Sequence, residues 1–156
     1  MIIDAHVHLP CYDDSLITLN EKKSRLLNDL IIAGVDGAIV IADSEMSSTI
    51  GTPKECVELF ADIQNINVIG GISPLIDYET RLNQLDEFLH NKSIVGCKLY
   101  PGHESYYMND TRLTDVFHRG EVDVFTVLQT FFTVPTISFI NGVSILSDSL
   151  RNNKRP

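Results

Sequence analysis

Basic residues are scarce in this sequence, and none of them gather into a basic run. Twelve Lys and Arg stand against 21 Asp and Glu, so the formal net charge of the 156 residues is −9. A protein that binds the phosphate backbone of a nucleic acid needs a patch or stripe of basic residues on its surface. We therefore expect no nucleic acid among the partners of this protein.

Cysteine is also scarce, and a secretory leader is missing at the start. The three cysteines, Cys11, Cys56 and Cys97, are odd in number and widely separated, which excludes a disulfide framework. The opening residues 1–4 lack the cationic and long apolar regions of a signal peptide. Both absences predict a reduced, cytoplasmic location.

Charge is absent from one long stretch, residues 124–146, which has the length of a membrane span. Polar residues, a proline and a glycine interrupt it throughout, and a spanning helix would place many of them in lipid. We therefore expect no membrane partner. With 44% apolar and 21% charged residues, the chain has enough material for a compact domain with a real core.

Strand-like and helix-like segments alternate along the first two thirds of the chain. Four apolar runs are predicted as strands, residues 2–9, 37–42, 68–72 and 94–100. Helices are predicted after the first two strands because Thr18 with Glu21, and Thr52 with Glu55, have the spacing of capping boxes. Apolar residues at helical spacing predict a third helix around residues 82–89 and a fourth after the Asn109-Asp110 cap.

Such repeated strand-helix units predict an α/β protein with a parallel sheet. An eight-fold βα barrel needs about 250 residues, or at least about 200, so this chain supplies roughly five of its units. An open doubly wound sheet fits the length better. In either architecture ligands bind at the carboxyl ends of the strands, where the βα loops gather.

Two histidines, His6 and His8, stand at that end of the first predicted strand in the sequence HVH. Residues at i and i+2 of a strand point to the same face and lie about 6.6 Å apart along the chain. Two imidazoles so placed can converge on one zinc-like ion, which acidifies bound water and polarises a substrate oxygen. A pair of solvated surface histidines is the alternative interpretation.

Four stretches in order carry a family resemblance: IDAHVHL, GVDGAIV, VGCKLYPG and NDTRLTDVF. Over about residues 1–118 the chain resembles the amidohydrolase-related proteins, which are metal-dependent (β/α)8 barrel hydrolases and decarboxylases. The resemblance implies a TIM-type barrel that is incomplete, with about four to five βα units. It also implies that His6 and His8 bind a divalent metal, zinc in our prediction, and that the substrate is a small organic molecule.

Lys98 is the second candidate at the rim, on the fourth predicted strand. It shares strand parity with Gly96 and Tyr100, which would leave room below it and place a tyrosine above it. A lysine in a low-dielectric site has a lowered pKa and becomes a nucleophile, a base or, once carbamylated, a metal ligand. We predict Lys98 as the catalytic residue, with a structural ion pair or a substrate contact as alternatives. Tyr100 and His103 are predicted to bind substrate.

The resemblance weakens near residue 118, where later strands should supply two more histidines and an aspartate. No histidine follows His118, and the segment 134–142, where a fifth strand is expected, has Ile140-Asn141 in place of a ligand. We therefore divide the chain into part of a barrel, residues 1–118, and a divergent or truncated tail, residues 119–156. The predicted function is a metal-dependent hydrolase that acts on a small organic substrate. Because the third histidine and the aspartate base are missing, we expect the activity of this chain alone to be near background. A metal-dependent decarboxylase and a non-catalytic binding or interaction module are the alternatives.

An incomplete barrel also leaves a strand edge unpaired and part of its core exposed, and both promote association. We expect a homo-oligomer or a self-associating chain. An open-sheet nucleotide binder is less favoured, because no glycine-rich loop follows the first strand.

Overall fold

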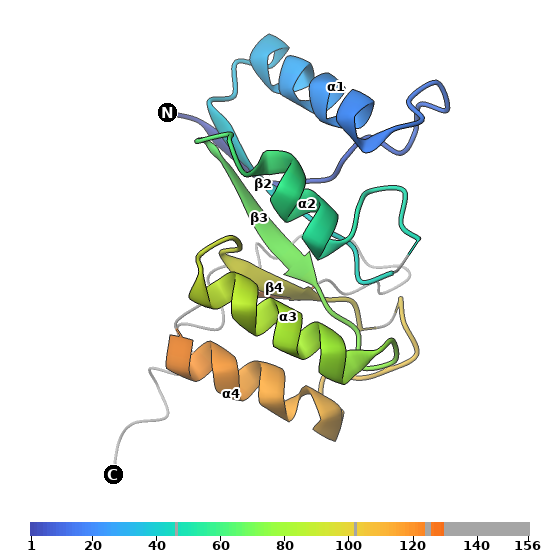
Figure 1. The fold of residues 1–156 in the computed structure, drawn as a ribbon, viewed down its shortest axis with the longest axis vertical. Helices are drawn as coiled ribbons and strands as arrows, with labels where there is room; N and C mark the ends of the chain where they lie inside the picture. Colours follow the sequence, from blue (N-terminus) through green and yellow to red (C-terminus); the bar gives the residue numbers. More distant parts are fainter. Residues whose placement is uncertain (46, 102, 124–125, 130–156) are drawn as a thin grey trace, which may run out of the picture.

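The computed structural model describes residues 1–45, 47–101, 103–123 and 126–129. A five-stranded, all-parallel sheet runs in the order β1-β2-β3-β4-β5. Its strands are β1 (Ile3–Val7), β2 (Gly37–Ile41), β3 (Ile66–Gly71), β4 (Gly96–Leu99) and β5 (Thr126–Gln129). This is the predicted α/β architecture, a curled part of a TIM-type barrel (Figure 1).

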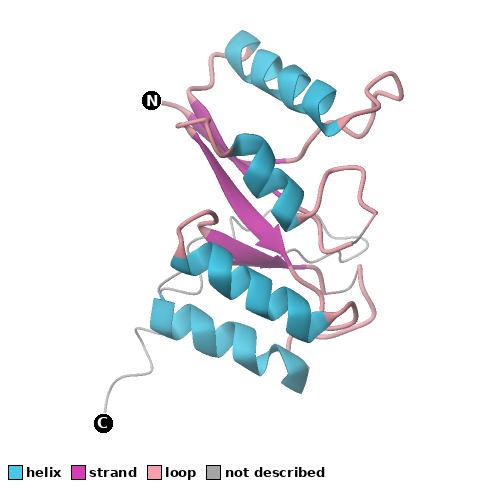
Figure 2. Cartoon of the chain, in the orientation of Figure 1, coloured by secondary structure: helices cyan, strands magenta, loops and turns pink. Residues whose placement is uncertain are grey.

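The helices that connect the strands are α1 (Leu19–Ile32), α2 (Pro53–Phe60), α3 (Tyr78–His90) and α4 (Thr114–Asp123), with a short 3₁₀ turn, η1 (Thr111–Leu113), before α4. They follow one another along the sheet in chain order (Figure 2). Both predicted capping boxes are present. The side chains of Thr18 and Thr52 each accept a hydrogen bond from the backbone N–H of the glutamate three residues later, and that glutamate's side chain accepts one from the backbone N–H of the threonine. Gly34, at φ 68°, follows the end of α1 as expected of a helix stop.

One continuous hydrophobic cluster fills the space between the sheet and these helices. Alternate residues of β2 and β4 enter it, and the helices contribute one apolar stripe each. Its strand members are Ala38, Val40, Ile66, Val68, Cys97 and Leu99, and its helix members are Leu26, Leu30, Cys56, Phe60, Leu82, Leu85 and Val116. Residues of the other parity point to the opposite face of the sheet, among them His6 of β1 and Lys98 of β4.

Gly71 permits a close approach at the carboxyl end of β3. A Cβ atom at this position would lie 2.6 Å from backbone atoms of Ala42, Asp43 and Ser44. The glycine therefore lets the start of the loop after β2, which includes Asp43, pass directly beside β3.

Several element boundaries differ from those predicted. β3 begins two residues earlier than expected, at Ile66, and α3 extends back to Tyr78. β5 occupies 126–129, ahead of the predicted fifth strand at 134–142, which lies outside the described residues. The division at residue 118 stays a prediction, and α4 continues across it to Asp123. None of the helices in the described part of the chain has the length and apolar character that a bilayer crossing requires.

Candidate active site

The two histidines of β1 and the loop after it meet at the rim of the sheet. Their Nε2 atoms lie 3.1 Å apart. The Nδ1 of His8 lies 3.0 Å from the backbone carbonyl oxygen of Ile41 on β2. Because a carbonyl oxygen only accepts hydrogen bonds, the proton of His8 resides on Nδ1 and its Nε2 carries the lone pair. The predicted pair is thus brought together, with one tautomer fixed by the neighbouring strand.

Lys98 approaches this pair from the other side of the sheet's concave face. Its side chain is only 1% exposed, and its Nζ lies 3.4 Å from Nε2 of His6. The Nζ also donates to the hydroxyl of Tyr100, at 2.5 Å. Since β2 and β3 separate β1 from β4 in the sheet, only the curvature of the sheet allows His6 and Lys98 to meet.

Burial sets the ionisation of this cluster. Burial, then the charge of Lys98 and the proximity of His6, together lower the pKa of His8 to about 4, against the opposing effects of the Ile41 carbonyl and Asp43. Burial and Lys98 likewise lower the pKa of His6, against the carboxylate of Asp4. Both imidazoles are therefore neutral at pH 7, which is the form that binds metals. Burial also lowers the pKa of Lys98 to about 8, against the charge of Asp43.

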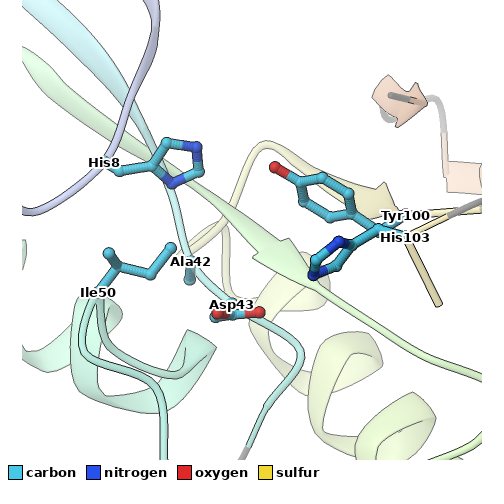
Figure 3. Close-up of a pocket in the computed structure, with 6 residues that line it drawn as sticks. All are labelled: His8, Ala42, Asp43, Ile50, Tyr100 and His103. Carbon is cyan, nitrogen blue, oxygen red and sulfur yellow. The ribbon is translucent and has the colours of Figure 1, made fainter. Parts of the chain in front are cut away.

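A cavity of about 160 Å³ opens beside the histidine pair. Figure 3 shows its lining, which comes from the ends of three strands and the loops after them: His8, Ala42, Asp43, Ile50, Tyr100 and His103. The rings of Tyr100 and His103 contact each other edge to face, with centroids 5.7 Å apart. The structure thus places His8, Tyr100 and His103, three of the predicted site residues, around one cavity.

Asp43 is the site residue that the sequence analysis missed. Its Oδ2 accepts a hydrogen bond from Ser48 Oγ at 2.8 Å, and its backbone N–H donates to Gly51 O at 2.9 Å. These bonds fold the loop back and hold the carboxylate at the cavity wall. The available signal was its position directly after a buried strand, where rim residues are expected.

A second polar contact joins the loops after β2 and β4. The buried Ser44 Oγ donates to Oε1 of Glu104 at 2.7 Å. Through this bond the loop that carries His103 is fixed to the loop that carries Asp43. Glu104 therefore supports the rim.

The residues present fit a metal ion as a partial set of ligands. Among the described residues, no group of three or more His, Cys, Asp or Glu side chains is arranged to hold a metal. The convergent histidines supply two donor nitrogens, and the buried amine of Lys98 adds a third nitrogen 3.4 Å from Nε2 of His6. A structural zinc site has four protein ligands and a catalytic one usually three. His90 and His118 are exposed on α3 and α4, away from the pair.

No protein-family model and no curated protein matches the sequence. Among solved structures, the chain is similar to a probable 2-pyrone-4,6-dicarboxylic acid hydrolase from Acinetobacter baumannii, determined with citric acid bound. The TM-score is 0.55 at 14% sequence identity, over 82% of this chain and 48% of that protein. The fold is therefore part of a TIM-type barrel. The chain spans about half the length of this neighbour.

Proposed function

We propose that the chain forms the metal-binding part of an amidohydrolase-type hydrolase that acts on a small organic substrate. The observation that carries this proposal is the convergence of the His6 and His8 Nε2 atoms at 3.1 Å. Two nitrogens that share a tetrahedral zinc at about 2.0 to 2.1 Å lie roughly 3.3 Å apart, close to this separation. The neutral state of both rings and the fixed tautomer of His8 support the same interpretation.

The roles of the other residues follow from their positions. A zinc ion at the pair would polarise a substrate carbonyl and acidify water. Lys98, whose pKa of about 8 lies near neutrality, holds a proton at Nζ that it can exchange with a reacting group, and Tyr100 orients that amine through its hydroxyl. Tyr100 and His103 form one wall of the cavity, whose volume suits a molecule about the size of benzene.

A non-catalytic binding module is the second candidate function. It is favoured by the small ligand set, since two histidines are fewer than the three protein ligands of most catalytic zinc sites. The two candidates share the metal site and differ only in turnover.

Zinc binding by the purified chain tests the site. We expect about one zinc per wild-type chain by elemental analysis. A His6→Ala/His8→Ala variant should bind at least about tenfold more weakly in calorimetric titration, because both donors are lost. His90→Ala is the matched control, an exposed histidine on α3, and should bind zinc like wild type.

Turnover then separates the two functions. Zinc-dependent hydrolysis of small lactones, amides or aryl esters that disappears in the double variant supports the hydrolase. Zinc binding without turnover supports the binding module. Equal zinc affinity of wild type and double variant would refute the site, as would zinc-dependent turnover that survives loss of both histidines.

A further inference from the structure

Asp43 gives an acidic wall to the cavity beside the histidine pair. Among the described residues that line this cavity, Asp43 is the one carboxylate, and none is a lysine or an arginine. In the described part of the chain, no salt bridge joins Asp43 to a basic side chain. The nearby amine of Lys98 donates to the hydroxyl of Tyr100 and lies against that residue's ring, 3.7 Å from its centroid. Among these residues, the carboxylate therefore has no cationic partner in contact with it.

The Asp43 carboxylate is held in place and keeps capacity for a ligand. Its Oδ2 accepts the hydrogen bond from Ser48 Oγ at 2.8 Å, and its Oδ1 accepts a longer one from the backbone N–H of Glu45, at 3.4 Å. A carboxylate offers about four acceptor positions, so about two remain open. A donor group that enters the cavity would meet an acceptor whose position is already fixed, which lowers the entropic cost of binding.

The other sides of the cavity suit a hydrocarbon group. Ala42 and Ile50 are apolar. The rings of Tyr100 and His103 form an aromatic wall. Figure 3 shows Asp43 and His8 on different sides of this space, with the aromatic wall on a third. Because ammonium groups are attracted both to carboxylates and to the faces of aromatic rings, a compact organic cation matches this lining in charge and in polarity.

We propose that this cavity binds a small organic ammonium ion, with its N–H groups on the Asp43 carboxylate and its hydrocarbon part beside Ile50 and the aromatic wall. This inference rests on the proposed function in that it names the substrate class of the same site, a small carbonyl compound that carries an amino group. A zinc ion at the histidine pair would add positive charge on the His8 side. Asp43, on a different side, would hold the ammonium group away from that ion. An anionic compound would instead be repelled by the Asp43 carboxylate.

Binding of matched small molecules to the metal-free full chain tests the proposal. Cyclopentylamine carries an ammonium group at pH 7, and cyclopentanol is its neutral analogue of nearly the same shape. Both are about the size of benzene, which a cavity of this volume accommodates. In NMR titrations at low ionic strength, wild type should bind the amine at least about tenfold more tightly than the alcohol, because the ammonium forms a charge-assisted hydrogen bond. Cyclobutanecarboxylate, an anion of similar size, should bind more weakly than either.

Asp43→Asn isolates the contribution of the carboxylate. The variant keeps the shape of the side chain and an oxygen that can accept from Ser48, but it removes the charge. We expect about a tenfold loss of cyclopentylamine affinity and an unchanged affinity for cyclopentanol. Asp62→Asn is the matched control, an exposed aspartate between α2 and β3 at the opposite end of the strands, and should bind both compounds like wild type. Circular dichroism checks that each variant folds.

Several results would overturn the inference. Wild type that binds no cyclopentylamine, or binds it no more tightly than cyclopentanol, would do so without any variant. Wild-type affinity for the amine in Asp43→Asn would place the binding elsewhere, and an equal loss in Asp62→Asn would show only a general attraction of cations to an acidic chain. Zinc titration of wild type and of the double-histidine variant tests the proposed function separately. Amine binding at Asp43 without zinc binding at the pair would refute the metal site alone, and the reverse would refute this inference alone.

Discussion

Replacement of Lys98 by methionine should change how stability depends on pH. Lys98 is 1% exposed, and burial lowers its pKa from 10.5 to about 8. A shift of this size corresponds to about 3 kcal/mol of unfavourable free energy for the charged form in the folded protein. That cost is fully present below pH 8, where the lysine is charged in both states.

The sign follows from proton counts. Between pH 8 and 10.5 the unfolded chain binds more protons than the folded one at Lys98, so this residue makes stability rise with pH in that range. Methionine carries no charge, so Lys98→Met should be more stable than wild type at pH 7 by up to about 2 kcal/mol. This figure allows about 1 kcal/mol for the lost hydrogen bond to Tyr100.

The advantage of the variant should fall by about 3 kcal/mol between pH 7 and 11 and reverse sign. Urea unfolding of both proteins at several pH values measures it. The difference between the two proteins is the relevant quantity, because burial raises the pKa of Cys56 and of Cys97 to about 12, which lowers the stability of both proteins above pH 9. If the difference in free energy of unfolding between the two proteins stays constant from pH 7 to 10.5, Lys98 is not a buried lysine with a lowered pKa and the reasoning is refuted.

Two further predictions concern the rim and the core. Gly71→Ala should destabilise the fold by about 1 to 3 kcal/mol in urea unfolding, because its Cβ would meet backbone atoms of 42–44 at 2.6 Å; unchanged stability would contradict this packing. In the native protein, iodoacetamide at pH 8 should label the exposed Cys11 alone, since Cys56 and Cys97 are buried with raised pKa values. Mass spectrometry should then find one adduct, and three in urea; two native adducts would contradict the burial.

Local signals in the sequence were sufficient for most helices. The capping boxes at Thr18 and Thr52 act within a few residues and formed as predicted. The start of α3 has no such signal, because Asp77 is left-handed at φ 41° and makes no side-chain cap bond. Its boundary was therefore placed too late.

The candidate site likewise combines contacts that the sequence predicts with contacts that it does not. The pairing of His6 and His8 follows from strand parity, which the sequence displays directly. Asp43 reaches the cavity only because its loop folds back through bonds to Ser48 and Gly51, and no periodicity encodes those contacts. Zinc binding, catalysis by Lys98 and substrate contacts at Tyr100 and His103 stay predictions.

The sequence by itself determined the alternating elements, the parallel sheet and the end of the first strand that bears the histidines, because these depend on period, caps and chain direction. Tertiary structure alone decided that His6 and Lys98, 92 residues apart, meet at 3.4 Å. That contact depends on how strongly four parallel strands curl. Curvature arises from the packing of helices against the sheet and from register across strands, and these are properties of the whole fold.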